Sequence, residues 1–227
     1  MEPILSFAVA AGAASAIAGL AVKDHRRART SRRGLLDDCA AHLADSRLAY
    51  GGDGFPRLAG LHAARPVRAE LIPDTMTIKR LPQLWLSVTL LVSPPISGSI
   101  AVLVRPSGND FYSLTEKLGV ALRPLRDLPW EVLARGSGVD PQSLLESLSA
   151  RIGAILSDPR VKEIAVTPKG LRIVRQAGEG RRGEHLLLRQ AVFDNAAVPV
   201  ADFERLLLAL ESLEAAVSEN FCREPPA

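Results

Sequence analysis

Cysteine, histidine and aromatic residues are all scarce in this chain. It has two cysteines, four histidines and an aromatic share of 4%. Cys39 and Cys222 lie far apart, with no CxxC or Cys/His spacing, which excludes the usual zinc motifs and fits a reducing compartment. No histidine has a nucleophile or a carboxylate at a defined spacing. The sequence therefore predicts no metal, no cofactor and no catalytic residue.

The chain also lacks a basic domain, although its net charge is +3. Residues 23–33 hold six of the 28 basic residues and one of the 25 acidic ones, so the remainder carries 22 against 24, or −2. Nucleic-acid-binding domains need a basic surface. The sequence therefore predicts no nucleic-acid partner.

The most apolar residues are gathered in one run near the amino terminus. Ile4–Val22 carries no charge, and the basic segment Lys23–Arg33 follows it without a spacer. About 20 apolar residues cross the ~30 Å hydrocarbon layer as a helix. Basic residues beside a span stay on the cytoplasmic side. The sequence predicts that residues 1–22 form a transmembrane anchor in an inner membrane. The amino terminus is then outside, and the residues after the anchor are in the cytoplasm. This layout resembles that of bacterial proteins with one amino-terminal span.

Two alternatives to an anchor remain open. A cleaved signal peptide fits the small residues of the run, but such peptides carry positive charge before it, where this chain has only Met1-Glu2-Pro3. A buried or surface helix is the other alternative, because alanine and glycine make the run weakly apolar. Small residues at four-residue spacing also allow self-association through the span. They are Ala8, Gly12 and Ala16 on one line and Ser15 and Gly19 on another.

The basic segment beside the run predicts contact with anionic lipid headgroups. Each cation near the bilayer is attracted by about 1 kcal/mol. The cations are Lys23, Arg26, Arg27, Arg29, Arg32 and Arg33.

The remaining chain is expected to form an α+β domain. Apolar residues at helical spacing, Leu36, Cys39, Leu43 and Tyr50, predict a connecting helix within residues 23–52. The glycines of residues 51–54 then suggest a hinge into a cytoplasmic domain over 53–220, which is expected to fold without the preceding residues. A division near residue 138, into 53–138 and 139–220, remains open. The tail over 221–227 is predicted to be disordered.

Period-two patterns predict a mainly antiparallel sheet with packed amphipathic helices. Strands are expected near residues 67–71, 76–78, 84–92, 100–104, 130–135, 161–166, 171–175 and 186–193. A short helix is expected over 111–118. Asp140 and Pro141 mark the start of a helix that ends at Asp158, and Pro199 opens a last one. The strand at 84–92 is apolar on both faces, so both faces of the sheet are expected to be covered.

Glycines 178, 180 and 183 match the GxGxxG pattern of dinucleotide-binding loops. Such a loop must open a helix, and the nine residues from His185 to Phe193 are too short for a helix that crosses a sheet. A hairpin loop is the better interpretation. Nucleotide binding at Gly178, Gly180 and Gly183 remains the alternative function.

The connection after residue 104 is the predicted partner surface. Phe111 and Tyr112 are adjacent, so at least one ring should be exposed, beside Arg105 and Asp110. The alternative is an ordinary connection in which Asp110 caps a helix. The sequence as a whole favours a membrane-anchored domain for binding or scaffolding over an enzyme.

Overall fold

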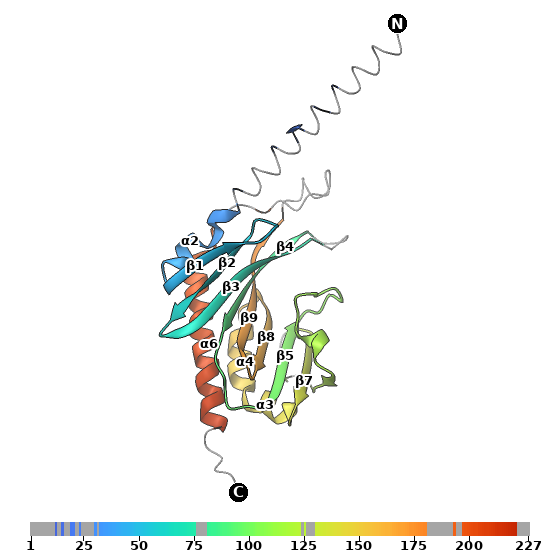
Figure 1. Cartoon of the computed structure of the whole chain (residues 1–227). Coiled ribbons are helices and arrows are strands. Elements are labelled where there is room, and N and C mark those ends of the chain that lie inside the picture. The colour runs from blue at the N-terminus through green and yellow to red at the C-terminus, as the bar shows by residue number, and fades with distance from the viewer. Residues whose placement is uncertain are drawn as a thin grey trace, which may run out of the picture.

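The computed structural model describes residues 12, 15, 19–20, 23, 30, 32–75, 81–123, 125, 130–180, 193 and 197–221. They form an α+β fold in which one nine-stranded antiparallel sheet has the α-helices packed on one face (Figure 1). The strands are β1 (Ala44–Tyr50), β2 (Pro56–His62), β3 (Arg65–Asp74), β4 (Gln83–Leu90), β5 (Gly98–Val104), β6 (Val120–Ala121), β7 (Val132–Gly138), β8 (Val161–Thr167) and β9 (Gly170–Glu179). The helices are η1 (Arg33–Leu36), α2 (Asp37–Ala40), η2 (Thr115–Lys117), α3 (Pro141–Ser147), α4 (Ser149–Leu156) and α6 (Val200–Phe221).

The strands follow one another across the sheet in the order β1-β2-β3-β4-β9-β8-β5-β7-β6. β4 pairs with β9 and β5 pairs with β8, so residues on both sides of position 138 build neighbouring strands of one sheet. The predicted alternation in β4 is present, because Leu86, Val88 and Leu90 all belong to the core beneath the helices. The alternate residues from Trp85 to Thr89 point to the second face of the sheet.

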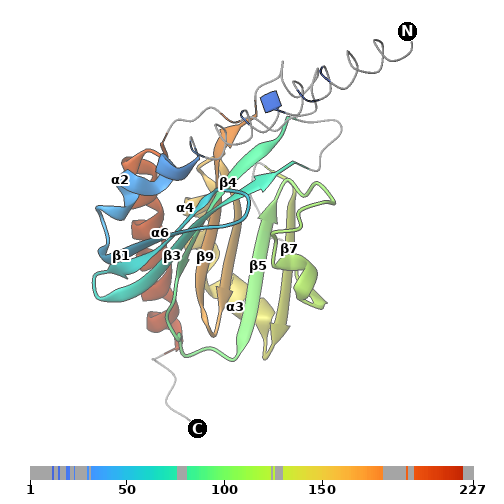
Figure 2. The same ribbon diagram turned by 45° about the horizontal axis from the view of Figure 1, so that its top comes forward.

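The α-helices lie on one side of the sheet, with α6 and α4 behind it in Figure 2, whereas η2 follows the connection that packs on the opposite face. Asp140 caps α3 as predicted, since its carboxylate accepts the N–H of Ser143 at 3.2 Å. The single helix predicted from Asp140 to Asp158 is interrupted at Leu148, where α3 ends and α4 begins. The predicted apolar stripe of α6 is buried at every position. It comprises Phe203, Leu206, Leu207, Leu210, Leu213 and Val217.

The helix predicted to reach Tyr50 is wrong beyond Ala40. After α2 the chain turns and forms β1, an edge strand paired with β2. Residues 51–54 are therefore the turn of a hairpin and not a hinge between domains. The apolar spacing was misleading because its members belong to different elements. The short helices and the loop after them place Leu36, Cys39 and Leu43 in the core, while Tyr50 belongs to strand β1.

Several predictions fall largely or wholly outside the described residues. These are the anchor over 1–22, apart from the exposed, helical Gly12, Ser15, Gly19 and Leu20, and the strands near 76–78 and 186–193, apart from Phe193. Within the part of the chain that the structure describes, no helix combines the length and apolar character needed to cross a membrane. The short helix expected over 111–118 is present only as η2.

Candidate functional site

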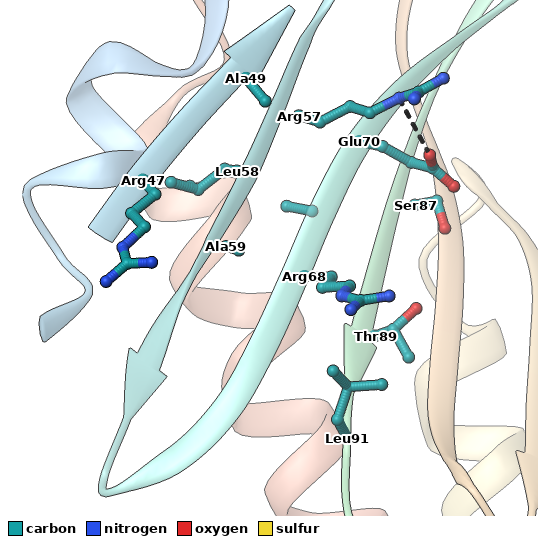
Figure 3. A pocket seen from close by; sticks show the side chains of 11 residues that line it. Arg47, Ala49, Arg57, Leu58, Ala59, Arg68, Glu70, Ser87, Thr89 and Leu91 are labelled. Carbon is teal, nitrogen blue, oxygen red and sulfur yellow. Dashed lines mark ion pairs between the residues drawn. The ribbon is translucent and has the colours of Figure 1, made fainter. Parts of the chain in front are cut away.

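A groove lies on the face of β1–β4 that points away from α6. It has a volume of about 470 Å³ (Figure 3). We call it the arginine groove. Its lining residues are Arg47, Ala49, Arg57, Leu58, Ala59, Arg68, Ala69, Glu70, Ser87, Thr89 and Leu91. The expectation that both sheet faces are covered is therefore wrong for β1–β3, whereas Trp85 and Ser87 of β4 are buried on this face.

Strand alternation explains why this face is polar and the opposite face is apolar. In β3, Val67, Ala69 and Leu71 are buried beneath the helices, while Arg68 and Glu70 point to the groove. β2 repeats the pattern with Leu58 buried and Arg57 and Ala59 exposed. A half-covered antiparallel sheet has this pattern.

The register brings residues that are far apart in sequence into rows across the groove. Arg47 lies opposite Ala59, which lies opposite Arg68, which lies opposite Thr89. The next row contains Ala49, Arg57, Glu70 and Ser87. Small side chains thus form the floor between arginines that stand on neighbouring strands.

The groove has an excess of positive charge. Arg57 pairs with Glu70 across 3.8 Å, and both side chains are exposed to solvent (Figure 3). Neither Arg47 nor Arg68 has an ion-pair or hydrogen-bond partner among the described residues. Three arginines against one glutamate leave two charges uncompensated, so the groove attracts anions.

The carboxyl end of the basic segment lies at the β1–β2 turn, near one end of this groove. Arg32 donates to the carbonyl of Asp53 at 2.9 Å, and Arg33 lies 5.3 Å from the Tyr50 ring. Lys23 has helical backbone conformation, and it is exposed to solvent. The other predicted lipid contacts, Arg26, Arg27 and Arg29, lie outside the described residues.

The predicted partner surface is largely buried. Tyr112 packs against Trp85 and is 7% exposed, while Phe111 is 49% exposed. One of the two rings is therefore exposed, as expected. Arg105 donates to the carbonyls of Pro159 and Val161 and lies over Trp130.

Asp110 is part of a buried polar cluster that fixes this connection to the sheet. Its carboxylate accepts the N–H of Ser107 at 2.6 Å and the Tyr112 hydroxyl at 3.2 Å, and it pairs with Lys162. Burial alone would raise the pKa of Asp110, but the two donors of Ser107 and the Lys162 ammonium outweigh it and lower that pKa. The cluster is therefore structural, and Asp110 is not the cap of a helix.

A second buried carboxylate, Glu163, anchors the same connection. It is 0% exposed and accepts the Ser113 hydroxyl, the Leu114 N–H and the Arg172 guanidinium. Because an uncompensated buried charge is costly, these donors hold the connection against β8 and β9. The connection therefore covers part of this sheet face over β8 and β9.

The glycines of the GxGxxG pattern lie in or beside a strand. Gly178 belongs to β9, and Gly180 forms a bridge with Phe193 and donates its N–H to Pro82. Gly183 lies outside the described residues. An extended backbone through Gly178 and Gly180 differs from the strand-to-helix turn that holds a pyrophosphate.

Among the described residues, no group of three or more metal-ligating side chains is present. Sequence reasoning missed Arg47, Arg57 and Arg68 as site residues. The alternation around Arg57 and Arg68 was a usable signal, but Arg47 was assigned to a helix.

No family model matches the chain, and no curated protein matches its sequence. Among solved structures, the chain aligns with the crystal structure of the mycobacterial trehalose monomycolate transport factor A, TtfA. The identity is 7% and the TM-score is 0.43, and the match covers 89% of this chain and 98% of that chain.

Proposed function

We propose that this chain is a binding or scaffolding protein attached to the cytoplasmic face of an inner membrane by residues 1–22. The arginine groove is its binding surface, and its partner carries negative charge. The observation that carries this proposal is the pair of arginines, Arg47 and Arg68, that stand exposed on either side of Ala59 on this sheet face. Positive grooves of this kind raise the local concentration of anions.

The lining of the groove favours binding over catalysis. It contains no histidine, cysteine or lysine, and Glu70, the carboxylate of the lining, pairs with Arg57. Ser87 and Thr89 are hydroxyls without a base positioned on them among the described residues. Nucleophilic catalysis by a hydroxyl requires such a base.

Membrane attachment is tested by fractionating cells that express the full chain with a carboxyl-terminal tag. We expect the chain in the membrane pellet after carbonate washing and the tag protected from protease in intact spheroplasts. Release by carbonate would contradict the anchor, and cleavage of the tag would contradict the orientation.

The enzyme alternative is tested by thermal unfolding of the full chain in detergent with nucleotides and dinucleotides. We expect no stabilisation. A shift of several degrees that Gly178→Val abolishes would favour the alternative. Gly178 suits this test better than Gly180, because an added Cβ would lie 3.9 Å from Leu84 at Gly178 but 3.0 Å from Pro82 at Gly180.

A further inference from the structure

Ala59 has an arginine on three of its four sides on the open sheet face. Arg57 precedes it by two residues in β2, and Arg47 and Arg68 are its cross-strand partners in β1 and β3. Neighbouring strands lie about 4.8 Å apart, and same-face residues of a strand about 7 Å apart. The Cα atoms of all three arginines therefore lie within about 7 Å of the Ala59 Cα. The small methyl group of Ala59 leaves space above it.

The arginines around Ala59 are available to a ligand. In Figure 3 the Arg68 guanidinium points toward Thr89, and the Arg47 guanidinium points away from Thr89. All three arginines are exposed, and exposed side chains change rotamer within picoseconds to nanoseconds. Arg47 and Arg68 can therefore turn toward an anion over Ala59 without breaking an ion pair to a described residue.

The size of the groove points to a small anionic group. Its volume of about 470 Å³ falls among small-molecule sites, which span about 300–1,000 Å³. Guanidinium groups bind phosphate through paired, charge-assisted hydrogen bonds. Three of them around one position match a phosphate group, which offers oxygens in several directions.

The surroundings of the groove point to a membrane as the source of the phosphate. Tyr50, which contacts Arg33, lies three residues beyond Arg47 in β1, about 10 Å along the strand and on the opposite face of the sheet. The last residues of the basic segment and the position over Ala59 therefore belong to the same hairpin. Cations placed this way attract anionic headgroups.

We infer that the arginine groove binds the phosphate group of an anionic phospholipid, seated over Ala59 among Arg47, Arg57 and Arg68. The lipid comes from the membrane to which we propose the chain is attached, so the inference rests on that proposed attachment. A lipid bound here holds the β1–β4 half of the sheet against the headgroup layer.

The test is calorimetric titration of the full chain in nonionic detergent with dihexanoyl-phosphatidylglycerol. Dihexanoyl-phosphatidylcholine, inorganic phosphate and an acidic octapeptide are titrated in parallel. We expect the phosphatidylglycerol to bind most tightly and its binding to weaken with salt. Equal or tighter binding of inorganic phosphate would overturn the lipid source, and tighter binding of the peptide would assign the groove to a protein partner. Absence of phosphatidylglycerol binding would overturn the inference outright.

Variants locate the bound phosphate. R47A/R68A should weaken phosphatidylglycerol binding about tenfold or more, because two charge-assisted contacts are lost. R151A/R160A removes the same charge from α4 and the turn after it, and should leave binding unchanged. Equal effects of the two double variants would show that binding depends only on the net charge of the protein. That result would contradict a phosphate site over Ala59.

A third variant keeps the test valid if R47A/R68A fails to fold. Ala59→Glu places a carboxylate where the phosphate is expected, so it should abolish binding while the thermal midpoint stays at or above that of the wild type. Binding that survives Ala59→Glu would contradict the inference. Fractionation of the wild type separates the two proposals, because a chain that carbonate releases can still bind the short-chain lipid.

Discussion

At the scale of single residues, Phe111 and Tyr112 occupy opposite environments although they are neighbours. Tyr112 packs against Trp85 and Val174 and is nearly buried, whereas Phe111 is half exposed. We predict that Tyr112→Ser lowers the free energy of unfolding by about 3–4 kcal/mol, as truncation of a buried aromatic ring does. Phe111→Ser should change it by less than about 1 kcal/mol. Urea unfolding of both variants measures the difference, and equal losses would contradict the assignment.

Asp110 gives the cluster around Tyr112 a dependence on pH. Its pKa is lowered in the folded state, so its ionised form stabilises the fold above the unfolded pKa near 3.9. That contribution is lost as pH falls through the folded pKa. We predict that Asp110→Asn costs about 3 kcal/mol at pH 7, because it removes one partner of a buried pair with Lys162.

The measurement for Asp110 is the stability difference between wild type and Asp110→Asn as pH is lowered from 7 to below 4. The difference should begin to shrink below about 3.9, where the carboxyl of the unfolded chain takes up a proton while the folded one is still ionised, and it should vanish below the folded pKa. A difference that stays constant would show that the carboxylate charge contributes nothing to the fold.

At the scale of elements, the segment before residue 53 is part of the domain. Leu35, Leu36, Cys39 and Leu43 are buried in the core, and the Val198 N–H donates to the Leu35 carbonyl at 2.9 Å. β1 also supplies Arg47 to the groove. The η1–α2–β1 segment therefore closes both the core and the candidate site.

Truncation tests the role of this segment. We predict that residues 32–221 fold cooperatively, whereas residues 53–221 form an aggregate or a molten species. The shorter chain loses three buried leucines, worth about 1.5–3 kcal/mol each, and exposes the edge of β2. Circular dichroism and urea unfolding compare the two, and a cooperative transition in the shorter chain would restore the boundary at residue 53.

At the scale of the whole molecule, the basic segment has two different parts. Arg32 and Arg33 contact the domain at the β1–β2 turn. The part from Lys23 to Arg29 precedes those contacts, and its arginines lie outside the described residues.

We predict that replacing Lys23, Arg26, Arg27 and Arg29 with glutamine lowers the fraction of molecules whose proposed anchor has its carboxyl end in the cytoplasm. Basic residues beside a span set which side stays in the cytoplasm. A carboxyl-terminal alkaline phosphatase fusion, active only outside the cytoplasm, should gain activity in this variant. Replacing Arg32 and Arg33 alone should have a smaller effect on topology, and a gain of activity in neither variant would contradict the proposed role.

The sequence by itself determined the periodic elements of this protein. The strand near 84–92 and the stripes of α3, α4 and α6 were predictable, because side chains that face one core repeat locally along the chain. The α+β class followed from the order of these patterns. β1 was not predictable in this way, since an edge strand with mostly exposed residues has no apolar period of two.

Only the tertiary structure decided where the arginine groove lies. Alternation shows which side chains share a face within one strand, but it does not show which strands become neighbours. Arg47, Arg57 and Arg68 surround Ala59 because β1, β2 and β3 pair in one particular register. A shift of one residue would turn each arginine into the core, and the cost of burying those charges is the physical reason that the register, and with it the groove, is fixed.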